Sequence, residues 1–230
     1  MATESPRSRN TQQDTEAYDS IQGYGKNLLA SARVYQKQLI AAAAVFCVVL
    51  VVGAGVLYFL DRAEDNASAM LIQISQQYES MDKNADDAAF ADIKQQFQTL
   101  IDEYGYTDAG KMALLQYAGI CYQTGEIDRS LELYQSAYEA FKGNPHFSQL
   151  ALNGMAYAQA AKGNDQEAIS LFQQVVEDGS PALKAQALFQ LGMLYSQTGN
   201  PEKSRQAYQR LVSGFSDSIF AEPARSRISG

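Results

Sequence analysis

Two patterns of apolar residues divide this chain. The first is an unbroken run from Leu39 to Leu60, LIAAAAVFCVVLVVGAGVLYFL, which carries no charge over 22 residues. At 1.5 Å per helical residue such a run extends about 33 Å, enough to cross a hydrocarbon core of roughly 30 Å. From about residue 61 onward, apolar residues instead recur three and four positions apart, as on one face of a helix. The two patterns predict an all-α chain with a single transmembrane helix followed by a helical domain.

A repeated unit marks the helical domain, at Gly125, Gly163 and Gly199. These glycines are separated by 38 and 36 residues, and each is expected to end a helix in a left-handed conformation. Residues of the same kind flank each glycine: Leu114, Leu152 and Leu188; Ala118, Ala156 and Gly192; Ser130, Ala168 and Ser204; Tyr134, Phe172 and Tyr208. Later helices are expected to begin at a capping side chain and a first-turn proline, at Asn144-Pro145, Ser180-Pro181 and Asn200-Pro201.

These repeated positions resemble the tetratricopeptide repeat, over roughly residues 107–215. The sequence departs from the family pattern at one aromatic position, where Leu114, Leu152 and Leu188 stand instead of tryptophan. The resemblance implies paired helices stacked into an α-solenoid. It also implies a protein-binding module, with partners held on a concave face that the first helix of each pair lines.

The predicted organisation has five parts. Residues 1–20 form a disordered cytoplasmic tail, residues 21–38 a basic juxtamembrane segment, and residues 39–60 the transmembrane helix. Residues 61–106 form membrane-proximal helices and a degenerate leading repeat, with helices expected over 63–81 and 86–104. Residues 107–230 hold the repeats and a capping helix at 218–228, because the end of a solenoid must cover its core. The basic segment either binds lipid or only sets the topology.

The flanks of the apolar run predict its orientation. Lys26, Arg33 and Lys37 precede the run, whereas the residues that follow it closely are Asp61, Arg62, Glu64 and Asp65. Because the positive flank stays cytoplasmic, residues 61–230 are expected outside, which in a bacterium means a periplasmic domain anchored in the inner membrane. A cleaved signal peptide is disfavoured, since 38 residues precede the run and the run exceeds the roughly 7–15 apolar residues of such signals.

Charge and candidate chemistry argue against several function classes. A formal net charge of -8 disfavours a nucleic-acid partner, whose phosphates require clustered lysine and arginine. His146 is the single histidine, which excludes a histidine metal cluster, and no phosphate-binding loop or nucleophile motif is present. Cys47 and Cys121 lie in unrelated segments, so we expect no disulfide between them. We therefore expect neither catalysis nor a cofactor or metal.

The candidate binding surface follows from the resemblance and consists of nearly uncharged side chains on the first helices. The residues predicted to line the groove are Leu115, Gln116, Tyr122, Gln123, Asn153, Tyr157, Phe189, Gln190 and Met193, with Met112, Gly119, Leu150, Ala160, Gln186 and Gln197 in a wider set. About a third of these residues are expected to be inter-helix core instead. The face lacks the basic clamp with which some family members grip a carboxylate. We therefore predict a groove for apolar or aromatic segments, with glutamines serving the peptide backbone.

Two functions fit this layout. A short N-terminal tail, one span and immediate helical repeats resemble the bacterial YfgM-type ancillary subunits of the Sec translocon, which implies a chaperone or adaptor beside the membrane. The alternative is a scaffold for envelope assembly or cell division, because the stretch FSDSIFAEPARSRI resembles turns common in such proteins. In both cases the partner is a protein.

Overall fold

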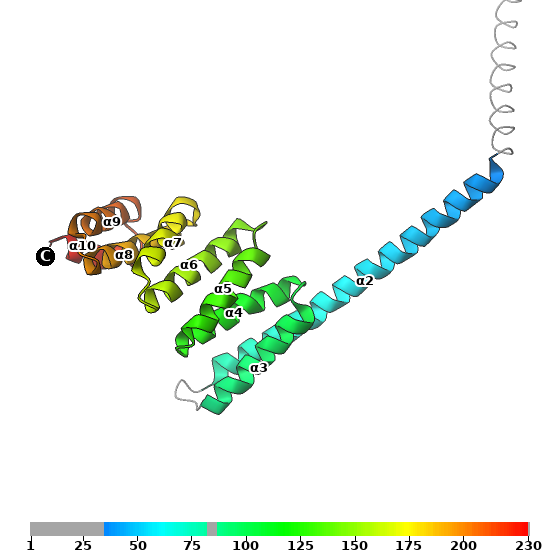
Figure 1. Ribbon diagram of the computed structural model, residues 1–230, viewed down its shortest axis with the longest axis horizontal. Coiled ribbons are helices and arrows are strands. Elements are labelled where there is room, and N and C mark those ends of the chain that lie inside the picture. Colours follow the sequence, from blue (N-terminus) through cyan, green and yellow to red (C-terminus); the bar gives the residue numbers. More distant parts are fainter. Residues whose placement is uncertain (1–34, 82–86, 230) are drawn as a thin grey trace, which may run out of the picture. The chain divides into compact units, whose positions relative to one another are not determined.

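The computed structural model describes residues 35–81 and 87–229, and its regular secondary structure within these ranges is entirely α-helical (Figure 1). The predicted tail, 1–20, and nearly all of the basic segment, 21–38, lie outside the described residues. The chain divides into two compact units, Met1–Phe59 and Leu60–Gly230. The helix α2, Gln36–Ser80, contributes to both units.

The first unit contains the apolar part of α2. The described side chains from Ile40 to Leu60 are all exposed, and this part of the helix is long and apolar enough to cross a membrane. A helix that is apolar on every side and meets no other protein element is stable only where lipid or another apolar surface covers it. This stretch of α2 is therefore a candidate membrane span.

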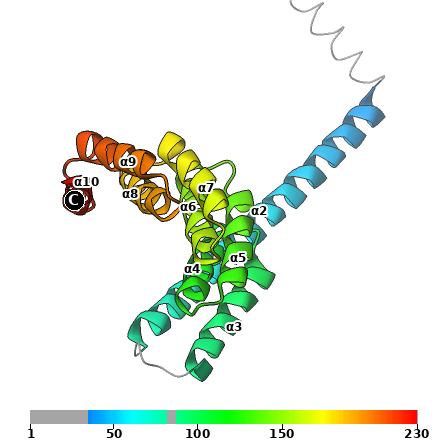
Figure 2. The same cartoon turned by 60° about the vertical axis from the view of Figure 1, so that its left-hand side comes forward.

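The second unit is a stack of paired helices that begins with the end of α2. The later helices are α3 Asp87–Tyr104, α4 Asp108–Gln123, α5 Ile127–Ala140, α6 Pro145–Ala161, α7 Asp165–Asp178, α8 Pro181–Gln197, α9 Pro201–Gly214 and α10 Ala221–Ser229. Figures 1 and 2 show α4 to α9 as three successive pairs, with α10 beside α9 at the C-terminal end. This arrangement confirms the predicted repeat solenoid, and it places the first helices α4, α6 and α8 next to one another along the stack.

Helix ends follow the glycines and prolines of the sequence. Gly125, Gly163 and Gly199 have φ angles of 80°, 79° and 74°, so the predicted left-handed conformation after α4, α6 and α8 is confirmed. Prolines begin α6, α8 and α9. However, the predicted side-chain caps are only partly correct.

Ser180 is the one of the three predicted caps that bonds as expected. Its hydroxyl accepts a hydrogen bond from the backbone N–H of Leu183, whereas Asn144 and Asn200 make no side-chain cap. The amide of Asn200 donates instead to the backbone carbonyl of Thr198 at 3.0 Å. The NH2 group of Asn200 is thus directed at a carbonyl of the preceding turn, and this local geometry is not encoded in the Asn-Pro pair itself.

Small residues allow the helices of a pair to approach closely. The buried hydroxyl of Ser130 donates to the backbone carbonyl of Ala118 at 2.8 Å, and Ser204 repeats this contact with Gly192 at 2.6 Å. A Cβ atom added to Gly192 would lie 2.4 Å from the ring of Tyr208. The recurring small and aromatic positions are therefore explained by packing within each pair.

The end of α2 and helix α3 lie where the degenerate leading repeat was predicted. Ala67, Ile74, Ile93 and Phe97 are buried in one hydrophobic cluster with α4. The carboxylate of Glu64 accepts hydrogen bonds from the backbone N–H groups of Asp108 and Ala109, at 2.7 and 3.0 Å. A carboxylate at the positive end of a helix is favourable, so α2 is held against the first turn of α4.

The end of the stack is closed by α10. Ala221 and Ala224 are buried in the same cluster as residues of α8 and α9. The predicted capping helix therefore exists, although it begins at Ala221 because residues 216–220 form turns.

Candidate functional site

A cavity of about 440 Å³ opens between the first two repeats and the start of the third. Its lining comes from four helices: Leu115 and Tyr122 of α4, Tyr134 of α5, Leu150, Asn153, Gly154 and Tyr157 of α6, and Gln186 of α8. Its volume is within the usual range for ligand sites, roughly 300–1,000 Å³. None of these side chains is charged, so the cavity is suited to a neutral group.

Helical spacing brings the α6 side chains together. Leu150, Asn153 and Tyr157 are three and four positions apart and therefore share one face of the helix. Gly154 lies between them, and a Cβ atom there would be 2.4 Å from the ring of Tyr134. The missing side chain at Gly154 thus allows the Tyr134 ring of α5 to form a wall of the cavity.

Neutral hydrogen bonds and aromatic contacts connect the cavity to α8 and α7. The Asn153 Nδ2 atom donates to Gln186 Oε1 at 3.4 Å, and Gln190 Nε2 donates to the Tyr157 hydroxyl at 3.0 Å. The Tyr157 ring meets Tyr122 edge to face with 6.3 Å between centroids. The Tyr157 ring also meets the buried ring of Phe172 edge to face, with 5.2 Å between centroids. Tyr157 is therefore fixed at the centre of the site.

Burial raises the pKa of two tyrosines of the cavity, Tyr134 and Tyr157. Desolvation raises the pKa of Tyr134 to about 12, and the nearby Tyr122 and Cys121 add to the effect. Burial also raises the pKa of Tyr157, although hydrogen bonds from Gln190 and Gln186 oppose the shift. Both of these side chains are accordingly neutral hydrogen-bonding groups near neutral pH.

Alkaline pH should destabilise the domain partly through Tyr134. Because its folded pKa lies above the ordinary value of about 10, the folded state holds the phenolic proton more tightly. This stability is complete below about pH 10 and is lost as pH rises toward 12. We expect Tyr134→Phe to retain about 2 kcal/mol more of its neutral-pH stability than the unaltered chain at about pH 12. Urea unfolding of both full chains in detergent, followed by circular dichroism at several pH values, measures the free energy of unfolding. If this free energy falls equally with pH in the two proteins, the expectation is contradicted.

The predicted groove residues do not all meet at this cavity. Leu115, Tyr122, Asn153 and Tyr157 line it, and Gln190 joins it through Tyr157. Leu150 and Gln186 of the wider set also line it. Tyr134 and Gly154 were not among the predicted groove residues. The sequence does contain one signal for Gly154, which occupies the position that Gln116 and Gln190 hold in the other repeats.

The remaining predicted residues make contacts elsewhere. Gln116 accepts a hydrogen bond from the Ser75 hydroxyl and Gln123 accepts one from the Tyr78 hydroxyl, both at 2.8 Å, so both engage α2. The Phe189 ring packs against Tyr208 and Phe220, with centroids 5.7 and 5.5 Å away. Met193 is half-buried against the C-terminal hydrophobic cluster. Phe189 and Met193 thus belong to the packing between helices.

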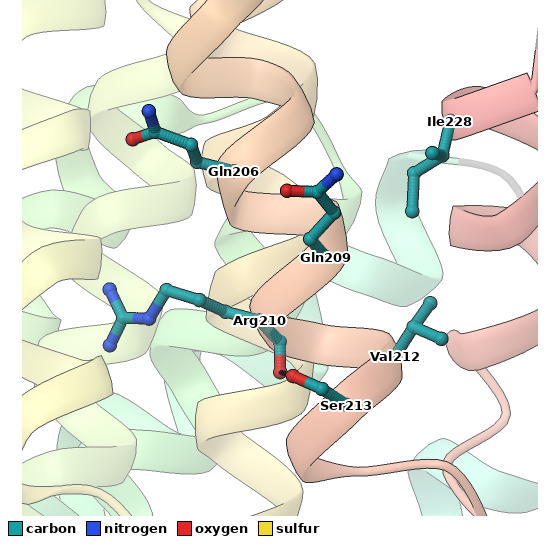
Figure 3. Close-up of a pocket in the computed structure, with 6 residues that line it drawn as sticks. All are labelled: Gln206, Gln209, Arg210, Val212, Ser213 and Ile228. Carbon is teal, nitrogen blue, oxygen red and sulfur yellow. Dashed lines mark hydrogen bonds between the residues drawn. The ribbon is translucent and has the colours of Figure 1, made fainter.

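A second hollow lies at the C-terminal end of the stack and is a weaker candidate. It measures about 510 Å³ and is lined by Gln206, Gln209, Arg210, Val212 and Ser213 of α9 and Ile228 of α10. Figure 3 shows Val212 and Ile228 in the space between the two helices, while Arg210 extends to the opposite side of α9. Its polar groups therefore do not converge on a common point. Among the described residues no cluster of metal-binding side chains is found either.

Comparisons with known proteins agree with the repeat fold. The family model described as "Tetratricopeptide repeat-like domain" matches residues 33–222. A crystal structure of a tetratricopeptide repeat protein from Parabacteroides merdae has the same fold, with a TM-score of 0.55 and 18% identity. The match covers 71% of this chain and 59% of that protein, so this chain spans little more than half of its length. No curated protein matches the chain. Since the family model covers most of the sequence, the chain belongs to the family of tetratricopeptide repeat-like domains.

Proposed function

We propose that this chain is a membrane-anchored binding protein that holds neutral apolar or aromatic segments of other proteins. The main observation that supports this proposal is the uncharged cavity, which is lined by three tyrosine rings and centred on Tyr157. Tetratricopeptide repeats are typically interaction modules without catalytic activity, and the family model matches nearly the whole repeat domain. The partner is therefore a protein, and recognition depends on shape and apolar contact more than on charge.

The apolar part of α2 serves as the anchor in this proposal. Its side chains are exposed over the whole stretch from Ile40 to Leu60, and the family model begins at residue 33, ahead of that stretch. Lysine and arginine residues precede the stretch and acidic residues follow it, which favours an N-terminus in the cytoplasm. The repeats would then lie on the outer face of a bacterial inner membrane.

A location beside the membrane exit of a translocon would give the cavity a supply of suitable segments. Chains that leave a translocon are unfolded and expose apolar and aromatic residues, which the neutral cavity would hold. The proposed role is therefore a translocon-associated chaperone or adaptor. A scaffold for envelope assembly or cell division would use the same cavity for one fixed partner.

Site-specific photo-crosslinking in intact membranes tests this function. Leu150 is 41% exposed at the cavity, so a photo-reactive residue there should capture the bound segment. Gln135 is exposed on α5 and outside the lining residues, which makes it the matched control position. Adducts at Leu150 with many exported chains or translocon subunits support the chaperone role. Adducts with one wall or outer-membrane assembly protein support the scaffold, and equal labelling at both positions contradicts the proposed groove.

A further inference from the structure

Asn153 has an oxygen atom without a hydrogen-bond partner. Its side chain is only 6% exposed, and Oδ1 accepts no hydrogen bond from the described residues. Its Nδ2 atom already donates to Gln186, so the unpaired atom is the acceptor. A buried polar group left unpaired destabilises the folded state, and a group of this kind in a native protein calls for an explanation. A bound ligand that supplies a donor to Asn153 would provide one.

The surroundings of Asn153 restrict the donor to a neutral, largely apolar group. Leu115 and Leu150 and the rings of Tyr122, Tyr134 and Tyr157 line the same cavity. No carboxylate is among the lining residues, so nothing there offsets the cost of desolvating a lysine or arginine. Edge-to-face contacts between rings add to the stabilisation from burial. An aromatic group with an N–H donor matches the walls, and it meets the acceptor once the buried Asn153 carboxamide turns toward the cavity.

Among protein side chains, the indole of tryptophan has this combination. Its ring N–H group donates one hydrogen bond and accepts none, so it can pair with Asn153 Oδ1 without leaving an unpaired acceptor of its own. Phenylalanine lacks a donor, and tyrosine brings a hydroxyl oxygen that would need a further donor. The bond from Asn153 to Gln186 is long, at 3.4 Å, and so only weakly restrains the carboxamide from turning toward the cavity.

We propose that the cavity holds one tryptophan side chain of the bound segment and that Asn153 accepts a hydrogen bond from its indole N–H. This assignment rests on the proposed function and narrows it to one kind of anchor residue. Asn153 is then the residue that determines specificity, whereas the tyrosine rings supply the apolar contact area. The equivalent positions in the other two repeats are occupied by Leu115 and Phe189. Of the three repeats, only the second therefore has an asparagine acceptor at this position.

Fluorescence can test the proposal cleanly because the chain contains no tryptophan. We would titrate the full chain in detergent into a short, neutral, end-capped peptide with one central tryptophan, and into the same peptide carrying 1-methyltryptophan. Both indoles fluoresce, but methylation removes the N–H donor. We expect the emission to shift to the blue on binding. We also expect about tenfold weaker affinity for the methylated peptide, because it cannot form the hydrogen bond to the buried acceptor.

A variant of nearly the same side-chain shape provides a second test of the role of Asn153. Asn153→Leu removes the unpaired acceptor, so its thermal stability should equal or exceed that of the unaltered chain, and it should bind the two peptides equally. Asn66→Leu changes an exposed residue of α2 and should keep the discrimination between the peptides.

Each outcome has a distinct meaning. If both peptides bind the unaltered chain with equal affinity and a blue shift, binding of aromatic segments at the cavity is supported but the proposed role of Asn153 is refuted. If neither peptide binds or shifts, the proposed function of the cavity fails as well. The comparison of peptides on the unaltered chain needs no variant, so it remains decisive even if Asn153→Leu does not fold.

Discussion

Replacing Phe172 by alanine should lower the free energy of unfolding by about 3–5 kcal/mol, the range for large core aromatics. The Phe172 ring on α7 is completely buried and meets Tyr157 edge to face, with 5.2 Å between centroids. Alanine would leave a void in the hydrophobic cluster that includes residues of α6, α7 and α8, which the stack cannot fully close. The same change removes the support of Tyr157, so binding of apolar peptides should weaken as well.

Urea unfolding of the full chain in detergent, followed by circular dichroism, measures this loss of stability. Ile219→Ala serves as the control, because Ile219 is 83% exposed and its truncation should change stability by less than about 0.5 kcal/mol. An equal, small effect of both substitutions would contradict the packing described for Phe172.

Two arginines at the centre of the apolar stretch should abolish membrane integration. Val49 and Val52 lie near the middle of the run from Leu39 to Leu60, and both are exposed. A charged residue at the centre of a membrane helix costs about 2.5–3.5 kcal/mol on insertion scales, so the pair should cost about 5–7 kcal/mol. We expect Val49→Arg combined with Val52→Arg to move the protein from the carbonate-resistant membrane fraction to the soluble or aggregated fraction.

The matched control places two arginines on the repeats. Gln135 and Gln174 are exposed on α5 and α7, so Gln135→Arg with Gln174→Arg adds the same charge outside the apolar stretch. This variant should remain in the membrane fraction. If the valine variant also remains there after carbonate extraction, the apolar part of α2 is not the anchor.

Local interactions explain how far the sequence alone predicted the fold. An uncharged run of apolar residues defines a long apolar helix whatever surrounds it, and the spacing of apolar residues defines the helical faces. Gly125, Gly163 and Gly199 end helices because glycine adopts a positive φ angle at little cost. Prolines begin α6, α8 and α9 because their missing N–H group is not needed in the first turn. Each of these signals acts within a few residues, so the repeat architecture was predictable.

The composition of the binding surface was predictable only in part. Leu115, Asn153 and Phe189 occupy equivalent positions in three repeats, so the repeat pattern alone predicts that all three line the groove. In the structure the first two line the cavity, whereas Phe189 is packed against Tyr208 and Phe220 because the stack ends there. Likewise, the approach of α2 engages Gln116 and Gln123. Which neighbour covers a repeat position depends on its place along the stack.

Residue spacing and backbone preference are enough to predict an all-helical chain with one long apolar helix and a series of paired helices. They do not predict that Gly154 admits the Tyr134 ring, or that the oxygen of Asn153 is buried without a partner among the described residues. Both facts depend on the distance between side chains of different helices. Such distances are set by how whole helices pack, and residue periodicity along one helix does not specify them.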